Sequence, residues 1–119
     1  MVNTSTRTAC KPRAMLFHIA DAGRWHDAQA SGEYTASTIG MELADVGFIH
    51  LCTDAQVAGV LDRFYRGVPN LVLLHVDESL VGSPVVFEHV GDAPEPFPHL
   101  YGPLPCSAVT SVEPLPARP

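Results

Sequence analysis

The run from Asn70 to Asp77 (Asn-Leu-Val-Leu-Leu-His-Val-Asp) is apolar over most of its length. Side chains alternate between the two faces of a strand, so this run places apolar residues on both faces. A strand of that kind is stable in the centre of a sheet, where both of its faces are covered. The rest of the chain must therefore supply neighbouring strands on either side and helices to cover the sheet.

Four further segments have the length and apolar character of short strands. Residues 14–20, 47–52 and 84–90 are the first three, and residues 107–112 can form a last strand before the chain ends. In the first segment Leu16, His18 and Ala20 share a face, and in the second Phe48, His50 and Cys52 do. The opposite faces carry mainly apolar residues, which we expect in the core.

Two segments predict helices. Asp21 is a suitable N-cap for a helix over residues 22–30, with Trp25 and Ala28 facing the core and Gly32 ending the helix. Thr53 followed by Gln56 fits a capping box for a second helix. That helix has an apolar stripe at i, i+3, i+4 and i+7, and Gly67 is expected to stop it; the stripe is Val57, Val60, Leu61 and Phe64.

The remaining segments predict loops. Residues 35–38 have loop character, residues 41–44 can form one helical turn, and residues 91–105 contain five prolines that hold the backbone extended. Five strands and two helices, unevenly interleaved, indicate an α+β fold rather than a doubly wound sheet. We predict a disordered leader over residues 1–13, one domain over residues 14–113 and a flexible tail over residues 114–119.

Composition excludes several classes of function. The 119 residues suit a single domain, and the net charge is −6. Between Ala14 and Glu113 only Arg24, Arg63 and Arg66 oppose thirteen acidic residues, a balance of −10 that disfavours nucleic-acid binding. No apolar run approaches the roughly 20 residues of a membrane span, and no secretory signal precedes the first strand. We expect a cytoplasmic protein, monomeric or weakly dimeric, whose partner is a small molecule.

Ionisable groups within apolar strands are the candidates for function. His18, His50 and Glu88 each interrupt such a strand, and a buried polar group must be satisfied by a partner. Each also has a structural interpretation: a hydrogen-bonded core histidine for His18 and His50, and an exposed edge position for Glu88. Three such strands in so short a chain favour a ligand cleft, with His50 in its wall.

The proline-rich loop adds two candidates. His99 and Tyr101 are expected to point the same way and to offer an imidazole and a phenol to a ligand, although the loop can equally be a rigid flap that seals the core. His18, His50, Glu88 and His99 also have the chemistry of metal ligands. Their spacing matches no recognised metal motif, so metal binding is an alternative and we assign no metal ligands.

Several motifs resemble the small bacterial family called domain of unknown function 952, in order over about residues 14–113. They are Phe17-His18-Ile19-Ala20, Gly47-Phe48-Ile49-His50-Leu51-Cys52-Thr53, Arg63-Phe64-Tyr65 and Phe97-Pro98-His99-Leu100-Tyr101-Gly102-Pro103-Leu104. The resemblance implies an ADP-ribosyltransferase-like fold: a split, mostly antiparallel sheet with two main helices and an open cleft. It implies no established activity.

Members of that wider fold that use NAD imply roles for individual residues. His18, on the first strand, would contact ribose or pyrophosphate. His50, with Thr53 nearby, would sit near the position on a second strand where those members carry a hydroxyl or aromatic group. Glu88 would be the catalytic glutamate. The sequence thus leaves two main hypotheses. One is an enzyme that acts on an N-glycosidic bond of NAD or an ADP-ribosyl group, with Glu88 and His50 catalytic. The other is a non-catalytic module that binds a small molecule through His18, His50, Thr53, His99 and Tyr101.

Overall fold

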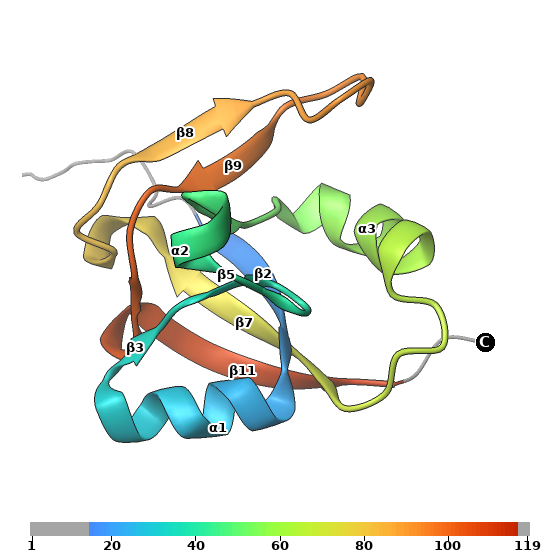
Figure 1. Cartoon of the computed structure of the whole chain (residues 1–119). Helices are drawn as coiled ribbons and strands as arrows, with labels where there is room; N and C mark the ends of the chain where they lie inside the picture. Colours follow the sequence, from blue (N-terminus) through green and yellow to red (C-terminus); the bar gives the residue numbers. More distant parts are fainter. Residues whose placement is uncertain (1–14, 117–119) are drawn as a thin grey trace, which may run out of the picture.

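A computed structural model describes residues 15–116 of the chain (Figure 1). The predicted leader over residues 1–13 lies outside the described residues. The predicted strand 70–77 is confirmed as β7 (Leu71–Asp77). It pairs antiparallel with β2 (Met15–Asp21) on one side and with β11 (Val109–Leu115) on the other, so it is the central strand of its sheet, as expected. β11 continues to Leu115 and so includes two residues that we predicted in the tail.

Helix α1 (Ala22–Ser31) covers one face of this sheet. The Asp21 side chain accepts a hydrogen bond from the Arg24 N–H (3.1 Å) and caps the helix, and Gly32 ends it with a φ of 88°. Trp25 and Ala28 are its buried residues. These features agree with the sequence prediction. Trp25 and Ala28 belong to a cluster of buried residues that we call the α1-side core. Its other members are Leu16, Ala20, Tyr34, Ala36, Ile49, Leu51, Leu74, Val76, Val81, Leu100, Leu104 and Ala108.

The opposite face of the sheet is covered by α3 (Val57–Phe64), which follows a 3₁₀ turn at Asp54–Gln56. Thr53 and Gln56 form the predicted capping box, with the Thr53 N–H donating to Gln56 Oε1 (2.9 Å). The α3-side core consists of Phe17, Ile19, Cys52, Leu61, Tyr65, Leu71 and Leu73. Strands β2 and β7 therefore contribute alternate side chains to two separate cores, as their alternation predicts.

A second three-stranded sheet has β9 (Phe97–Leu100) between β6 (Ile49–His50) and β8 (Val85–Glu88), all antiparallel. An isolated bridge joins this sheet to the first: the Phe17 N–H donates to Cys52 O (2.8 Å), and the Cys52 N–H donates to Phe17 O (2.7 Å). Figure 1 shows the β8–β9 hairpin beyond the edge of the first sheet, on the same side as α3.

Short elements complete the fold. β3 (Glu33–Tyr34) pairs with β10 (Leu104–Pro105), and β4 (Ala36–Thr38) pairs with β5 (Met41–Glu42), which leads into α2 (Leu43–Val46). Two 3₁₀ turns lie at Glu78–Leu80 and Cys106–Ala108. None of the helices described is long and apolar enough to cross a bilayer. The chain is thus an α+β domain with antiparallel sheets and few helices.

Three sequence expectations are wrong in detail. Residues 36–38 form a strand rather than a loop, and the proline-rich segment 91–105 contains β9 and β10. Pro98 has no N–H to donate, but its carbonyl accepts from the Leu51 N–H (3.0 Å), so the strand tolerates it. Helix α3 ends at Phe64 rather than near Gly67, and Phe64 is 66% exposed rather than part of the core. Tyr65 takes the buried place instead.

Candidate functional site

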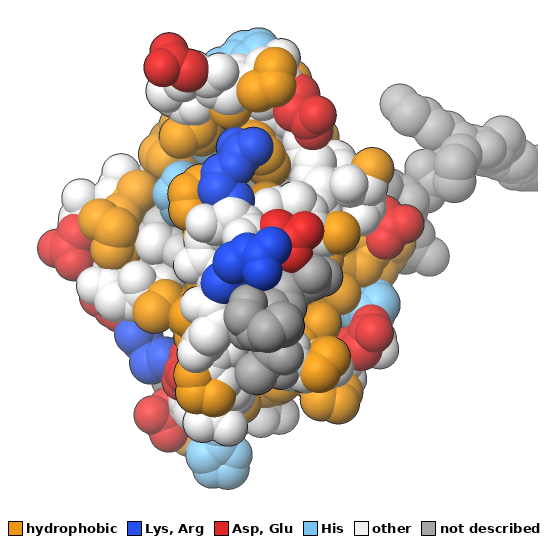
Figure 2. All heavy atoms as spheres, turned by 90° about the vertical axis from the view of Figure 1, so that its right-hand side faces the viewer, with side chains coloured by type: hydrophobic (Ala, Val, Ile, Leu, Met, Phe, Trp, Pro, Cys, Tyr) orange, Lys and Arg blue, Asp and Glu red, His pale blue; other side chains and the backbone are white. Residues whose placement is uncertain are grey.

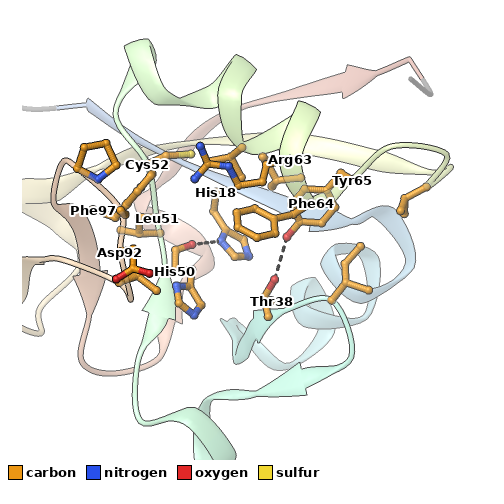
Figure 3. Close-up of a pocket in the computed structure, with 17 residues that line it drawn as sticks. His18, Thr38, His50, Leu51, Cys52, Arg63, Phe64, Tyr65, Asp92 and Phe97 are labelled. Carbon is orange, nitrogen blue, oxygen red and sulfur yellow. Dashed lines mark hydrogen bonds between the residues drawn. The ribbon is translucent and has the colours of Figure 1, made fainter. Parts of the chain in front are cut away.

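A cavity of about 690 Å³ lies between the two sheets and the end of α3 (Figure 3). Five segments line it: β2, the β4–β5 turn, β6 with the two residues after it, α3 with the residues that follow, and the β8–β9 loop. Most of the lining is apolar. The side chains with polar or ionisable groups are His18, Thr38, His50, Cys52, Arg63, Tyr65 and Asp92.

His18 is a fully satisfied wall residue. Its Nδ1 lies 2.6 Å from the His50 carbonyl oxygen, and its Nε2 lies 3.2 Å from the Tyr34 hydroxyl. A carbonyl can only accept, so Nδ1 carries the proton and the Tyr34 hydroxyl donates to Nε2. Desolvation by burial is the main cause that lowers the pKa of His18 to about 4, so the ring is neutral at pH 7.

His50 presents its ring to the cavity. In the described part of the chain its ring nitrogens make no hydrogen bond, and the residue is only partly buried. Desolvation, and then the nearby His99, lower the pKa of His50, so it too is a neutral imidazole at pH 7. A neutral imidazole offers one donor and one acceptor to a ligand. Of the two histidines that line the cavity, His50 is therefore the one with hydrogen-bonding capacity to spare.

Glu88, His99 and Tyr101 form a cluster behind His50, outside the cavity lining. The His99 Nδ1–H donates to Glu88 Oε1 (2.7 Å), and the Tyr101 hydroxyl donates to the same oxygen. These two hydrogen bonds, that of Tyr101 first, lower the pKa of Glu88. The His99 ring stacks on Phe48 at 4.0 Å between centroids and meets the His50 ring edge-on at 5.2 Å. His99 and Tyr101 point the same way, as predicted.

One nitrogen of this cluster has no partner. His99 is 2% exposed, and its Nε2 is buried without a hydrogen bond in the part of the chain that is described. The Nδ1–H of the same ring donates to the Glu88 carboxylate, so only Nε2 is left without a partner. Burying a polar atom without a partner is costly, so this nitrogen is a site of unsatisfied hydrogen bonding directly behind the cavity wall.

The predicted site residues are thus divided between two places. His18 and His50 line the cavity, whereas Glu88, His99 and Tyr101 contact one another beside it. Thr53 takes part in the capping box and is not among the lining residues. Within residues 15–116, no group of three or more His, Cys, Asp or Glu side chains is placed to hold a metal ion.

Sequence reasoning missed several lining residues. Thr38 and Tyr65 hydrogen-bond through their hydroxyls (2.8 Å) across the cavity wall, and Asp92 comes from the β8–β9 loop (Figure 3). Arg63 also lines the cavity, although the sequence singled it out only as an internal basic residue and as part of the Arg63-Phe64-Tyr65 motif. It stands in the last turn of α3, where its position on the exposed side of the helix gives no sequence signal of a cavity.

Comparison with known proteins gives a family and a related structure. Residues 19–112 match the family model described as "Protein of unknown function (DUF952)". The crystal structure of protein CC0527 from Caulobacter crescentus is 32% identical over 83% of each chain, with a TM-score of 0.71. The solution NMR structure of CC0527 is 36% identical over 85% of this chain and 84% of that one, with a TM-score of 0.68. No curated protein matches the chain.

Proposed function

Since the chain belongs to the DUF952 family, whose description assigns no activity, we propose a function from the cavity itself: the protein binds a small, largely apolar molecule there. The observation that carries the proposal is a cavity of about 690 Å³ with a mostly apolar lining. Ligand pockets commonly have volumes of about 300–1,000 Å³ and a few polar groups that orient the ligand.

His50 supplies the orienting polar group. His50 lines the cavity and its ring nitrogens have no protein partner among the described residues, whereas both nitrogens of His18 are engaged. A ligand hydroxyl or carbonyl that bonds to His50 gains a partner in a partly desolvated place. His18 then acts as packing surface and holds the backbone of His50 in place through the 2.6 Å hydrogen bond to its carbonyl.

The position of Glu88 favours binding over chemistry. A catalytic carboxylate must reach the reacting atoms, but Glu88 does not line the cavity and already accepts from His99 and Tyr101. The cavity lining carries a single arginine, and it also carries an aspartate. A diphosphate brings two negative charges, for which this lining offers little compensation.

The test uses 2-naphthol and naphthalene as probes with ¹H–¹⁵N chemical-shift titration. We expect both probes to perturb residues of the cavity lining, and 2-naphthol to bind more tightly because its hydroxyl can bond to His50. His50→Ala should remove that difference while the spectrum stays folded, and His26→Ala, a change at an exposed histidine of α1, should keep it. Chemical-shift changes scattered over the surface, or no changes at all, would contradict the proposal.

A second candidate function is hydrolysis of the N-glycosidic bond of NAD or a related ADP-ribosyl group. The presence of Arg63 in the cavity lining favours it, together with the ADP-ribosyltransferase-like fold that the family resemblance implies. In this reaction the bond between the ribose C1′ and the nicotinamide nitrogen breaks, water forms a bond to C1′, and nicotinamide and a proton are released. Incubation with NAD and chromatography for nicotinamide tests it; no release and no thermal shift at millimolar NAD would count against it.

A further inference from the structure

Arg63 is a cation at the cavity that has no ion-pair partner within the described part of the chain. Other ionisable residues there are paired, for example Arg24 with Glu42, His75 with Glu113 and His99 with Glu88. The contact of Arg63 with its neighbour Phe64 is a cation–π one, with the guanidinium carbon 5.9 Å from the ring centroid. Arginine presents a planar fork of N–H donors that matches a carboxylate.

The mouth of the cavity is apolar. Ile39, Phe64 and Val90 all line the cavity and are 41%, 66% and 44% exposed. They come from the β4–β5 turn, the end of α3 and the segment after β8, so three separate segments contribute exposed apolar side chains to the mouth. Figure 2 shows the face of the molecule that carries α3, where hydrophobic side chains lie beside basic ones.

From these two features we propose that the ligand of the cavity is an amphiphilic monocarboxylate. Its carboxylate binds the guanidinium of Arg63, and its apolar body lies against the cavity wall and the apolar mouth residues Ile39, Phe64 and Val90. The inference rests on the proposed function, since it names the chemical class of molecule that the cavity takes.

The charges of the lining set the number of negative charges on the ligand. Arg63 is the one arginine or lysine among the lining residues that are described, and His18 and His50 are neutral at pH 7 for the reasons given above. Asp92, from the β8–β9 loop, repels any further negative charge. One carboxylate therefore fits this set of groups better than a phosphate monoester or a diphosphate.

The apolar mouth explains why the ligand should be an amphiphile rather than a small polar acid. A ligand that covers the apolar side chains around a cavity removes their surface from water, which stabilises the complex. An acid with only a few carbons would leave Ile39, Phe64 and Val90 in water. A longer chain covers them and should bind more tightly with each added methylene.

The test is calorimetric titration of the full chain with decanoate, 1-decanol and hexanoate. We expect one decanoate per chain, bound about tenfold more tightly than 1-decanol, which corresponds to about 1.4 kcal/mol, and more tightly than hexanoate. Arg63→Gln should remove the preference for decanoate. Arg66→Gln, the same loss of charge at a residue outside the cavity lining, should keep it. High salt should weaken decanoate binding in the wild type but not in Arg63→Gln.

Two other outcomes are informative. Equal binding of decanoate and 1-decanol, unchanged by Arg63→Gln, would overturn the carboxylate assignment while the small-molecule function stands, provided that 2-naphthol binds. Failure of decanoate, 1-decanol and 2-naphthol alike would overturn both proposals. Phe64→Ser separates the mouth from the cation: we expect it to weaken decanoate more than hexanoate, and equal weakening would remove the role of the mouth.

Discussion

His18 shows how burial fixes the state of one residue and makes stability depend on pH. The unfolded chain takes up a proton on this imidazole near pH 6.5, but the folded chain resists protonation until about pH 4. A base whose pKa is lower in the folded state contributes stability that is fully present above the unfolded pKa. That stability is lost as the pH falls through this window, because protons then favour the unfolded chain.

We predict that the free energy of unfolding decreases between pH 6.5 and 4 by about 3 kcal/mol on account of His18, at 1.36 kcal/mol per pKa unit. Urea unfolding at several pH values measures the decrease. It should be smaller in His18→Gln and unchanged in His26→Gln, which alters an exposed histidine. An NMR titration of His18 in the folded wild type provides an independent measurement. A folded-state pKa near 6.5 would contradict this account.

The histidines also show what sequence reasoning can establish about a single residue. Alternation along the strands correctly placed His50 on the face opposite Ile49 and Leu51, which are both in the α1-side core. It did not show that both nitrogens of His18 are satisfied, since their partners are Tyr34 and the carbonyl of His50. These two hydrogen bonds join residues that are separated by 16 and by 32 positions in the sequence. They depend on how the strands meet in space, which local sequence patterns do not encode.

The Glu88–His99 pair makes a prediction about a tautomer. In the neutral form of the wild-type His99 ring we expect the proton on Nδ1, because the carboxylate of Glu88 accepts from it. Glu88→Gln should make the other tautomer accessible, and long-range ¹H–¹⁵N spectra distinguish the two. Glu113→Gln is the matched control, since it alters the carboxylate that pairs with His75. The same mixture of tautomers in wild type and Glu88→Gln would disprove this role for Glu88.

At the scale of elements, the sequence predicted best where a periodic pattern had clear ends. The boundaries of α1, β7 and the capping box before α3 followed from caps and apolar periodicity. β9 was missed because Pro98 and the surrounding prolines are typical of loops. Its pairing with β6 and β8 compensates through backbone hydrogen bonds that join residues far apart in the sequence.

Gln56 connects two elements that form the cavity. Its Oε1 accepts from the Thr53 N–H, and its Nε2 donates to the Glu95 carboxylate (2.7 Å) and to the Pro96 carbonyl (2.9 Å). The start of α3 is thereby fixed to the segment before β9. Gln56 is itself buried, so the loss of its side chain leaves its hydrogen-bond partners without a partner in a partly desolvated environment.

We predict that Gln56→Ala destabilises the fold by about 1–3 kcal/mol, the cost of leaving buried polar groups without partners. It should also speed amide hydrogen exchange in the β8–β9 loop. Gln29→Ala, at an exposed position of α1, provides the control and should change neither quantity. Unchanged exchange in the loop of Gln56→Ala would show that these hydrogen bonds do not hold it.

At the scale of the whole molecule, the α+β class and a central strand were predictable from the sequence, whereas the full lining of the cavity was not. The cavity lies where five segments from all along the domain come together, and its apolar residues individually resemble ordinary core residues. Phe64 is the clearest case. Helical periodicity assigned it to the core, whereas α3 ends there and leaves it exposed at the mouth.

The two cores should respond differently to truncation. Leu74 is fully buried in the α1-side core, so Leu74→Ala should destabilise the fold by about 2–5 kcal/mol. Val60 only partly packs against the α3-side core and already borders the cavity, so Val60→Ala creates little new enclosed space and should cost about 1 kcal/mol or less. Chemical unfolding measures both. Similar costs for the two variants would mean that the cavity is as tightly packed as the core.

The separation of the two cores has a consequence for how members of this family can diverge. We expect partly buried residues that border the cavity from the α3 side, such as Val60, to change at small cost to folding, while the α1-side core maintains the architecture. Under the function proposed above, relatives with the same backbone could acquire different ligands by a few substitutions around the mouth. A ligand identified for a related protein such as CC0527 would therefore be a starting point for this chain rather than an assignment, and specificity should be compared at Ile39, Arg63, Phe64 and Val90.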